Sequence, residues 1–125
     1  MESFNPSQHY PEYYSAARKN ARIRSRRLSE ARKKGKHTKQ QWIEMKIFFN
    51  HTCCKCLGET GVLNIEKDHI IPLYKGGSDG IDNIQPMCAL CNIRKNSEII
   101  DWRPKLAVLL NKKLPQEYKL NPINE

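Results

Sequence analysis

Four cysteines supply the strongest chemical signal in this 125-residue chain. They form two C-x-x-C pairs, Cys53 with Cys56 and Cys88 with Cys91. Two such pairs offer four thiolates, which complete a tetrahedral shell around one Zn²⁺. A complete shell has no open position, so we expect this zinc to be structural. The fifth cysteine, Cys54, is left over, because one residue between it and Cys56 is too few for the usual turn between ligands.

The cellular compartment can be predicted from the absence of two kinds of apolar segment in the sequence. The first ten residues are polar, without the apolar run of a signal peptide, and no stretch approaches the ~18 apolar residues of a membrane span. These features predict a cytoplasmic protein with no membrane partner. In a reducing compartment, paired C-x-x-C motifs are typical of metal sites rather than of disulfides.

A second chemical signal, Asp68-His69, lies between the two cysteine pairs. A carboxylate is a hard oxygen ligand that suits Mg²⁺ or Mn²⁺, and an imidazole can accept a proton from water near neutral pH. Neighbours on a strand point to opposite faces of the sheet. Taken alone, the dipeptide therefore favours a surface aspartate beside a half-buried histidine without a catalytic role.

The elements that position these residues can be read from periodicity and capping signals. A strand is predicted over residues 62–71 and a short second strand over residues 83–87, joined by the Gly-rich segment 75–80. Residues 89–98 read as a helix that starts on the second cysteine pair. Pro104 suits the first turn of another helix, whose predicted apolar face consists of Leu106, Leu109, Leu110 and Leu114.

Two further helices are predicted before the first cysteine pair. The first covers residues 11–34 and ends at Gly35, with only a thin apolar stripe that predicts weak docking or ordering on a partner. The second starts at Thr38, where Gln41 completes a capping-box pattern. Its predicted buried face consists of Trp42, Ile43, Met45, Ile47 and Phe49.

Together, the motifs strongly resemble the HNH endonuclease family. The resemblance rests on Asp68-His69-Ile70-Ile71-Pro72, a Gly-rich loop, Asp82-Asn83-Ile84-Gln85-Pro86-Met87-Cys88 and Cys91-Asn92-Ile93-Arg94-Lys95, and it covers about residues 38–96. It implies an α+β fold: a small ββα-metal (His-Me finger) core with a structural zinc held by four cysteines, flanked by N- and C-terminal helices. The expected divisions are 1–37, a basic DNA-contacting extension, 38–100, the nuclease domain, and 101–125, a C-terminal helix and tail.

The resemblance also implies roles for individual residues. His69 would be the general base, Asp68 and Asn92 the ligands of a catalytic cation, and Asn83 the residue that ties the hairpin loop and holds His69. Many members have His where this chain has Asn92, so the chain is an H-N-N variant. Mg²⁺ or Mn²⁺ is the expected catalytic metal, with Ni²⁺ or Co²⁺ as further candidates. Lys95, and more weakly Arg94, could contact a phosphate, although a solvated helix face explains both about as well.

The charge of the chain also indicates DNA as the partner. The chain carries a net charge of +9, and residues 1–50 hold 12 Lys and Arg against 4 Asp and Glu. This distribution favours contact with the DNA backbone over a merely solvated helix. The candidate contacts in this segment are Arg18, Lys19, Arg22, Arg24, Arg26, Arg27, Arg32, Lys33 and Lys34.

The sequence thus predicts a metal-dependent endonuclease that acts on double-stranded DNA. One base and one metal suit one strand at a time, in a monomer or weak homodimer. Family likeness suggests phage DNA processing, with packaging proteins as partners. We also expect the hydrolytic centre not to depend on residues 1–34. The alternative is a non-catalytic zinc-ribbon module that binds nucleic acid; it explains the cysteines and the charge but not the motif positions of Asp68, His69, Asn83 and Asn92.

Overall fold

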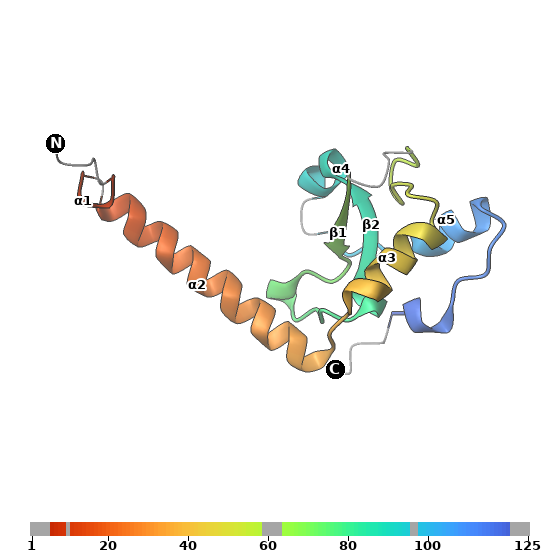
Figure 1. Ribbon diagram of the computed structural model, residues 1–125, viewed down its shortest axis with the longest axis horizontal. Coiled ribbons are helices and arrows are strands. Elements are labelled where there is room, and N and C mark those ends of the chain that lie inside the picture. The colour runs from red at the N-terminus through yellow and green to blue at the C-terminus, as the bar shows by residue number, and fades with distance from the viewer. Residues whose placement is uncertain (1–5, 10, 59–63, 96–97, 121–125) are drawn as a thin grey trace.

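A long helix projects from the body of the protein (Figure 1). This computed structural model describes residues 6–9, 11–58, 64–95 and 98–120. After the short α1 (Pro6–His9), α2 (Pro11–Lys34) runs for 24 residues, or ~36 Å at 1.5 Å per residue. The predicted helix and its end before Gly35 are confirmed. Of its apolar stripe, only Ala31 in the last turn is buried.

The next helix, α3 (Lys39–Phe48), starts where the capping signal predicts. Thr38 Oγ1 accepts a hydrogen bond from Gln41 N at 3.0 Å, and Thr38 N donates to Gln41 Oε1 at 2.8 Å, so the capping box is confirmed. Trp42, Met45 and Phe49 are buried in the core, as predicted. The prediction was wrong for Ile47, which is 58% exposed.

The predicted hairpin with a long connection is present. Strand β1 (Ile65–His69) pairs antiparallel with β2 (Ile84–Cys88), with Asp68 opposite Gln85 and His69 opposite Ile84. Two 3-10 turns, η1 (Leu73–Lys75) and η2 (Ile81–Asn83), lie in the connection. The first two residues of the predicted strand, 62 and 63, lie outside the described residues.

Two short helices follow the sheet. Helix α4 (Ala89–Arg94) is shorter than predicted, and it contacts both strands. Helix α5 (Arg103–Leu109) buries Leu106 but leaves Leu109 58% exposed, so the predicted four-leucine face is wrong at that position. The chain turns at Asn111, where φ is +56°, and then reaches the 3-10 turn η3 (Gln116–Tyr118). The protein is therefore a small α+β structure built on a two-stranded sheet.

A fully buried arginine fixes the C-terminal segment to the sheet. The Arg103 guanidinium donates to the carbonyl oxygens of Ile81, Asp82 and Ile84 at 2.7–3.3 Å, and it also pairs with Asp101. These bonds satisfy both a buried charge and backbone groups where η2 passes into β2. The C-terminal helix thus supports the strand that lies opposite Asp68 and His69.

Candidate functional site

The four cysteines of the two C-x-x-C pairs converge on one point. Their sulfur atoms all lie within 4.8 Å of one another, and the Sγ atoms of Cys56 and Cys88 are 3.9 Å apart. Four Zn–S bonds of about 2.3 Å in a tetrahedron would place the sulfurs about 3.8 Å apart. Cys91 N also donates to Cys88 Sγ at 3.4 Å. The cluster fits a structural Zn²⁺, held by Cys53, Cys56, Cys88 and Cys91.

The electrostatics of the cluster also favour a bound cation. Burial acts to raise the pKa of Cys53, but backbone hydrogen bonds from Cys56, Cys88 and Lys55 outweigh it and lower the pKa to about 7. Burial and the neighbouring sulfurs raise the pKa of Cys91 to about 12. Four thiolates this close repel one another, and a central dication would offset that repulsion.

Cys54 lies outside this cluster. Its thiol is buried and donates to Gln85 Oε1 at 3.4 Å. Burial, followed by the nearby Cys53 and Asp68, raises the pKa of this thiol. Cys54 is therefore a neutral core residue in this structure. As the C-x-x-C spacing predicted, it is not one of the four clustered cysteines.

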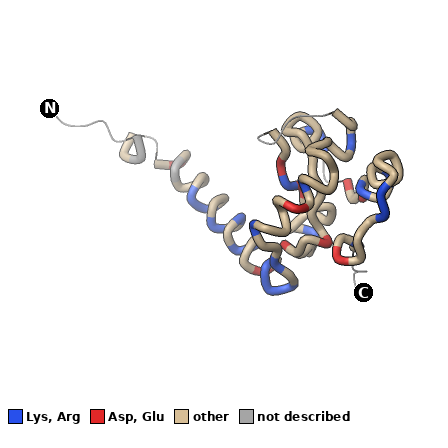
Figure 2. The backbone as a smooth tube through the Cα atoms, turned by 45° about the vertical axis from the view of Figure 1, so that its right-hand side comes forward, with Lys and Arg blue, Asp and Glu red and all other residues tan. Residues whose placement is uncertain are grey.

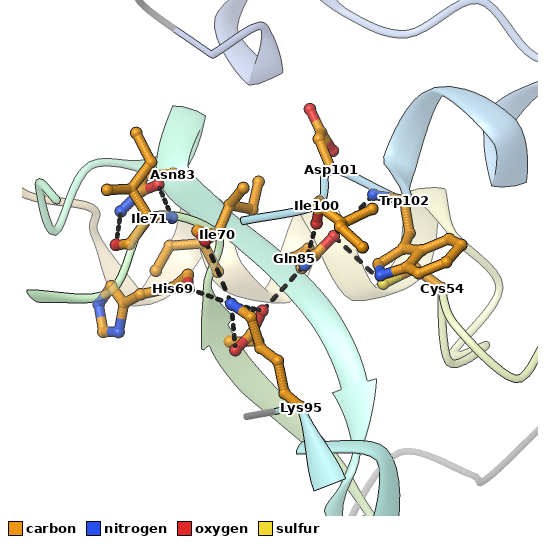
Figure 3. A network of polar contacts seen from close by, with 12 residues as sticks. Cys54, His69, Ile70, Ile71, Asn83, Gln85, Lys95, Ile100, Asp101 and Trp102 are labelled. Atoms are coloured by element: carbon orange, nitrogen blue, oxygen red, sulfur yellow. Dashed lines mark hydrogen bonds and ion pairs between the residues drawn. The ribbon is translucent and has the colours of Figure 1, made fainter. Parts of the chain in front are cut away.

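The Asp68 carboxylate, predicted to bind a catalytic cation, is buried in a polar network. Figure 3 shows Lys95 and Gln85, which belong to this network, from close by. Lys95 Nζ lies 2.8 Å from Oδ2 and 3.1 Å from Oδ1 of Asp68. The same ammonium donates to the carbonyl oxygens of His69 at 2.6 Å and Ile70 at 3.2 Å. On the other side, Gln85 Nε2 donates to Asp68 Oδ2 at 2.8 Å. Gln85 in turn reaches the C-terminal segment, through Ile100 O at 3.1 Å.

These contacts bear on the phosphate contact that was expected for Lys95. A phosphate contact was considered for Lys95, but its ammonium is buried and already surrounded by four oxygen atoms. A phosphate would have to compete with a buried carboxylate for this charge. Arg94, in contrast, is exposed on α4.

His69 is oriented by Asp79, a residue of the Gly-rich connection for which no role was predicted. Its Nε2 lies 2.8 Å from Oδ1 of Asp79, in the connection between the strands. The imidazole is 24% exposed, whereas the Asp79 carboxyl is only 6% exposed. The histidine thus stands at the surface of the site with a buried carboxylate behind it.

Asn83 closes the connection between the strands. Its Oδ1 accepts from Ile71 N at 2.8 Å, and its Nδ2 donates to Ile71 O at 3.1 Å and to Ser78 O at 2.7 Å. Gly77 packs so closely here that an added Cβ would lie 1.9 Å from Ile71 O, which explains the glycine. Asn83 therefore ties the two sides of the loop together, and its partner Ile71 lies two residues beyond His69.

Four of the predicted site residues share one open pocket. The pocket has a volume of about 380 Å³, and its lining comprises Lys67, Asp68, His69, Pro72, Leu73, Tyr74, Asn92 and Lys95. Asp68 and Asn92 supply the carboxylate and amide oxygens that suit a hard cation such as Mg²⁺ or Mn²⁺. The donor chemistry fits this cation. A cation bound to Asp68 would either share the carboxylate with the Lys95 ammonium or displace that ammonium.

The predicted DNA contacts on α2 are exposed to solvent. All nine basic side chains proposed on α2 are exposed, and Figure 2 shows Lys and Arg along the projecting helix and at its base. The end of the helix nevertheless contacts the site: Lys34 Nζ donates to Gly76 O at 2.8 Å, and Arg32 Nε lies 3.6 Å from Asp79 Oδ2. Residues 32 and 34 thus contact the loop beside His69, although we expected the hydrolytic centre not to depend on residues 1–34.

Fold and site together define a small, basic α+β protein with a four-cysteine cluster that fits a zinc site, and with a histidine and an acid in one pocket. Residues 52–98 match the family model described as HNH endonuclease. The family assignment made from the motifs is thereby confirmed. Members of this family are generally nucleases that act on DNA, so the match supports an endonuclease.

The other comparisons add no relatives. No curated protein and no solved structure matches the chain. Among the described residues, no helix is long and apolar enough to cross a membrane.

Two residues that shape the site were missed at the sequence level, Asp79 and Gln85. Gln85 could have been found from the hairpin, because its place opposite Asp68 follows once the register is known. Asp79 offered a weaker signal, an acid after Gly76 and Gly77 in a predicted loop. Its contact with His69 depends on how that loop folds back.

Proposed function

We propose that this protein is a metal-dependent endonuclease that hydrolyses phosphodiester bonds in double-stranded DNA. One observation carries the proposal: Asp68, His69 and Asn92 line a single open pocket, next to a four-cysteine cluster, within the segment that matches the HNH family. The non-catalytic zinc-ribbon alternative accounts for the cysteines, but it gives no reason for these three residues to meet. We further assign β1, β2 and α4 to a ββα-metal core.

Asp68 and Asn92 would hold the divalent cation, with Mg²⁺ or Mn²⁺ preferred by their oxygen donors. When bound, such a cation supplies stabilisation of the charge that develops on the scissile phosphate and the departing oxygen. Gln85 and Lys95 keep the Asp68 carboxylate in a fixed position through hydrogen bonds of 2.8 Å each. Lys95 is therefore proposed as an organiser of Asp68 rather than as a phosphate contact.

His69 acts as the general base in this proposal. It accepts the proton of the attacking water, and its position beside Asp68 places that water near the scissile phosphate. Asn83 acts indirectly, because it closes the loop that follows His69. The expected products carry 5′-phosphate and 3′-hydroxyl ends.

The basic residues of α2, with Arg94 on α4, would bind the DNA backbone. Exposed Lys and Arg side chains along a helix neutralise phosphates without reading the sequence. A single pocket and a single base suit the cleavage of one strand at a time, so cutting both strands would require two protomers or two events. DNA processing or packaging in a phage is the setting that we propose.

Nicking of a supercoiled plasmid tests the proposal. The protein should convert supercoiled to relaxed circles with Mg²⁺ or Mn²⁺, stop with a chelator, and resume when Mg²⁺ alone is returned. Restoration by Mg²⁺ without added zinc separates the catalytic cation from the structural one. DNA ligase should reseal the nicks, because their ends are 5′-phosphate and 3′-hydroxyl.

His69→Ala is the matched control for contaminating nucleases. It should reduce the nicking rate by about 10²–10⁴-fold, the usual contribution of a general base, and leave DNA affinity within a few-fold. If the wild-type protein binds DNA but nicks no faster than His69→Ala with any of the four metals, the binding module is the correct function.

A further inference from the structure

Asp79 is a buried acid that takes no part in the reaction proposed above. It follows Gly77 and Ser78 in the connection between β1 and β2, and it is 4% exposed. A buried carboxylate is costly unless charged or polar groups compensate it. Its closest partner is His69 Nε2, 2.8 Å from Oδ1.

The other charged or titratable groups around this carboxylate come from α2 and the segment after it. Arg32 Nε lies 3.6 Å from Oδ2, on a side chain that is half exposed. His37 Nδ1 lies 3.6 Å from Oδ1 but only 2.7 Å from the backbone oxygen of Asp79, so it bonds to that carbonyl instead. Lys95 donates to the backbone oxygen of His69 and pairs with Asp68, the residue before it. Among these groups, His69 makes the shortest contact with the carboxylate.

The chemistry of this contact selects one form of the histidine. An ionised carboxylate only accepts hydrogen bonds, so Nε2 must carry the proton that it donates. In a neutral imidazole the lone pair then lies on Nδ1. In the described part of the chain, no group bonds to Nδ1, and the imidazole lines the open pocket with Asp68 and Asn92.

We infer that Asp79 is a positioning residue for the reaction: it fixes the orientation of His69 and keeps its proton on Nε2, which leaves Nδ1 to accept the proton of water. The inference rests on the proposed function. It adds an Asp79–His69 pair to the site, in which the carboxylate never touches the substrate. The proton passes from water to Nδ1 while the Nε2 proton stays in place.

The last turn of α2 holds Asp79 in position. Asp79 N donates to Gly35 O at 3.1 Å and to Ala31 O at 3.3 Å, and His37 N donates to Asp79 O at 2.9 Å. Lys36 and Asp79 also form a short parallel bridge. The proposed DNA-binding helix and the orientation of the catalytic imidazole therefore share one residue. The base of α2 is a part of the hydrolytic site.

Single-turnover cleavage with Asp79→Ala and Asp79→Asn tests the role. Asp79→Ala should lower the rate at saturating protein by about 10–100-fold, the usual cost of losing a partner that orients a reactive group, while the Kd for DNA changes little. Asp79→Asn keeps the shape, and its amide oxygen can accept from Nε2, so it should lose less. Glu66→Gln, an exposed acid on β1, removes one negative charge and should cleave at the wild-type rate.

The ¹⁵N spectrum of the His69 imidazole gives a readout that a merely structural role would not change. In the neutral wild-type protein the proton should be on Nε2, and in Asp79→Ala it should be distributed over both nitrogens. A wild-type His69 with its proton on Nδ1, or an Asp79→Ala variant that folds and cleaves at the wild-type rate, would overturn the inference. The spectrum of the wild-type protein decides the tautomer even if Asp79→Ala does not fold, or if the protein cleaves no DNA.

Discussion

The ammonium of Lys95 lies between the two carboxylate oxygens of Asp68, at 2.8 and 3.1 Å, and both side chains are buried. These two residues stand 27 positions apart, one on β1 and one at the end of α4. Their contact holds the helix against the strand that carries His69. It also places a positive charge beside the carboxylate proposed to bind a metal.

Loss of Lys95 should therefore destabilise the protein strongly. Lys95→Met keeps most of the apolar stem but leaves Asp68 buried without its charged partner, which should lower the free energy of unfolding by about 3–5 kcal/mol. Urea unfolding measures the change. Arg94→Met, at the exposed neighbouring position, should change stability by less than about 0.5 kcal/mol.

A double-mutant cycle identifies the partner. Asp68→Asn combined with Lys95→Met should cost clearly less than the sum of the two single changes, because neither buried charge is then left alone. Additive effects would show that Lys95 is stabilised mainly by the backbone carbonyls of His69 and Ile70.

Substitution of each cysteine by serine should distinguish the four proposed zinc ligands from Cys54. Cys53→Ser, Cys56→Ser, Cys88→Ser and Cys91→Ser should each lose zinc and melt at a lower temperature, since an incomplete shell no longer holds the ends of the site segment together. Cys54→Ser should keep one zinc per chain. Zinc content measured with thermal melting checks each variant, and zinc loss in Cys54→Ser alone would refute the ligand assignment.

Truncations of α2 should separate DNA binding from site assembly. Removing residues 1–24 deletes Arg18, Lys19, Arg22 and Arg24 but leaves the last turn on the Asp79 loop. DNA binding should weaken, and the slope of log K against log salt should fall by about 0.9 for each phosphate that the shortened protein no longer neutralises. The single-turnover rate at saturating protein should be retained.

Removing residues 1–34 should additionally lower that rate, because Ala31, Arg32 and Lys34 are deleted along with their bonds to the loop. Equal single-turnover rates for the two truncated proteins would mean that the loop holds Asp79 without α2. An unchanged salt slope in both would mean that the basic helix faces away from DNA.

Asn92 offers a test of metal preference. An amide oxygen suits Mg²⁺ and Mn²⁺, whereas imidazole nitrogen favours Mn²⁺, Co²⁺ and Ni²⁺. Asn92→His should stay folded, retain some nicking activity, and show a higher ratio of Ni²⁺- to Mg²⁺-supported rates. Asn92→Ala should lose most activity with all four metals.

Nicking rates of the three proteins in each metal provide the comparison. Wild-type activity in Asn92→Ala would rule out Asn92 as a ligand. An active Asn92→His protein with an unchanged metal ratio would place this side chain away from the metal.

Local signals in the sequence were enough for much of this protein. The capping box at Thr38, the end of α2 before Gly35 and the hairpin between the cysteine pairs each depend on residues close together in the chain. The four-cysteine cluster was also predictable, because the C-x-x-C spacing itself brings two thiolates to one side of a turn. The family followed from motifs that occur in order, and the match over residues 52–98 confirms it.

Only the tertiary structure decided how the site is charged. Lys95 turns inward to Asp68, Asp79 lies behind His69, and Arg103 is buried against the carbonyls of η2 and β2. A polar residue leaves few signs in the sequence of whether it faces water or a buried partner, because either state is stable when its hydrogen bonds are satisfied. The partners here lie 10 to 27 positions apart, and the folding of the loop and α4 against the sheet brings them together.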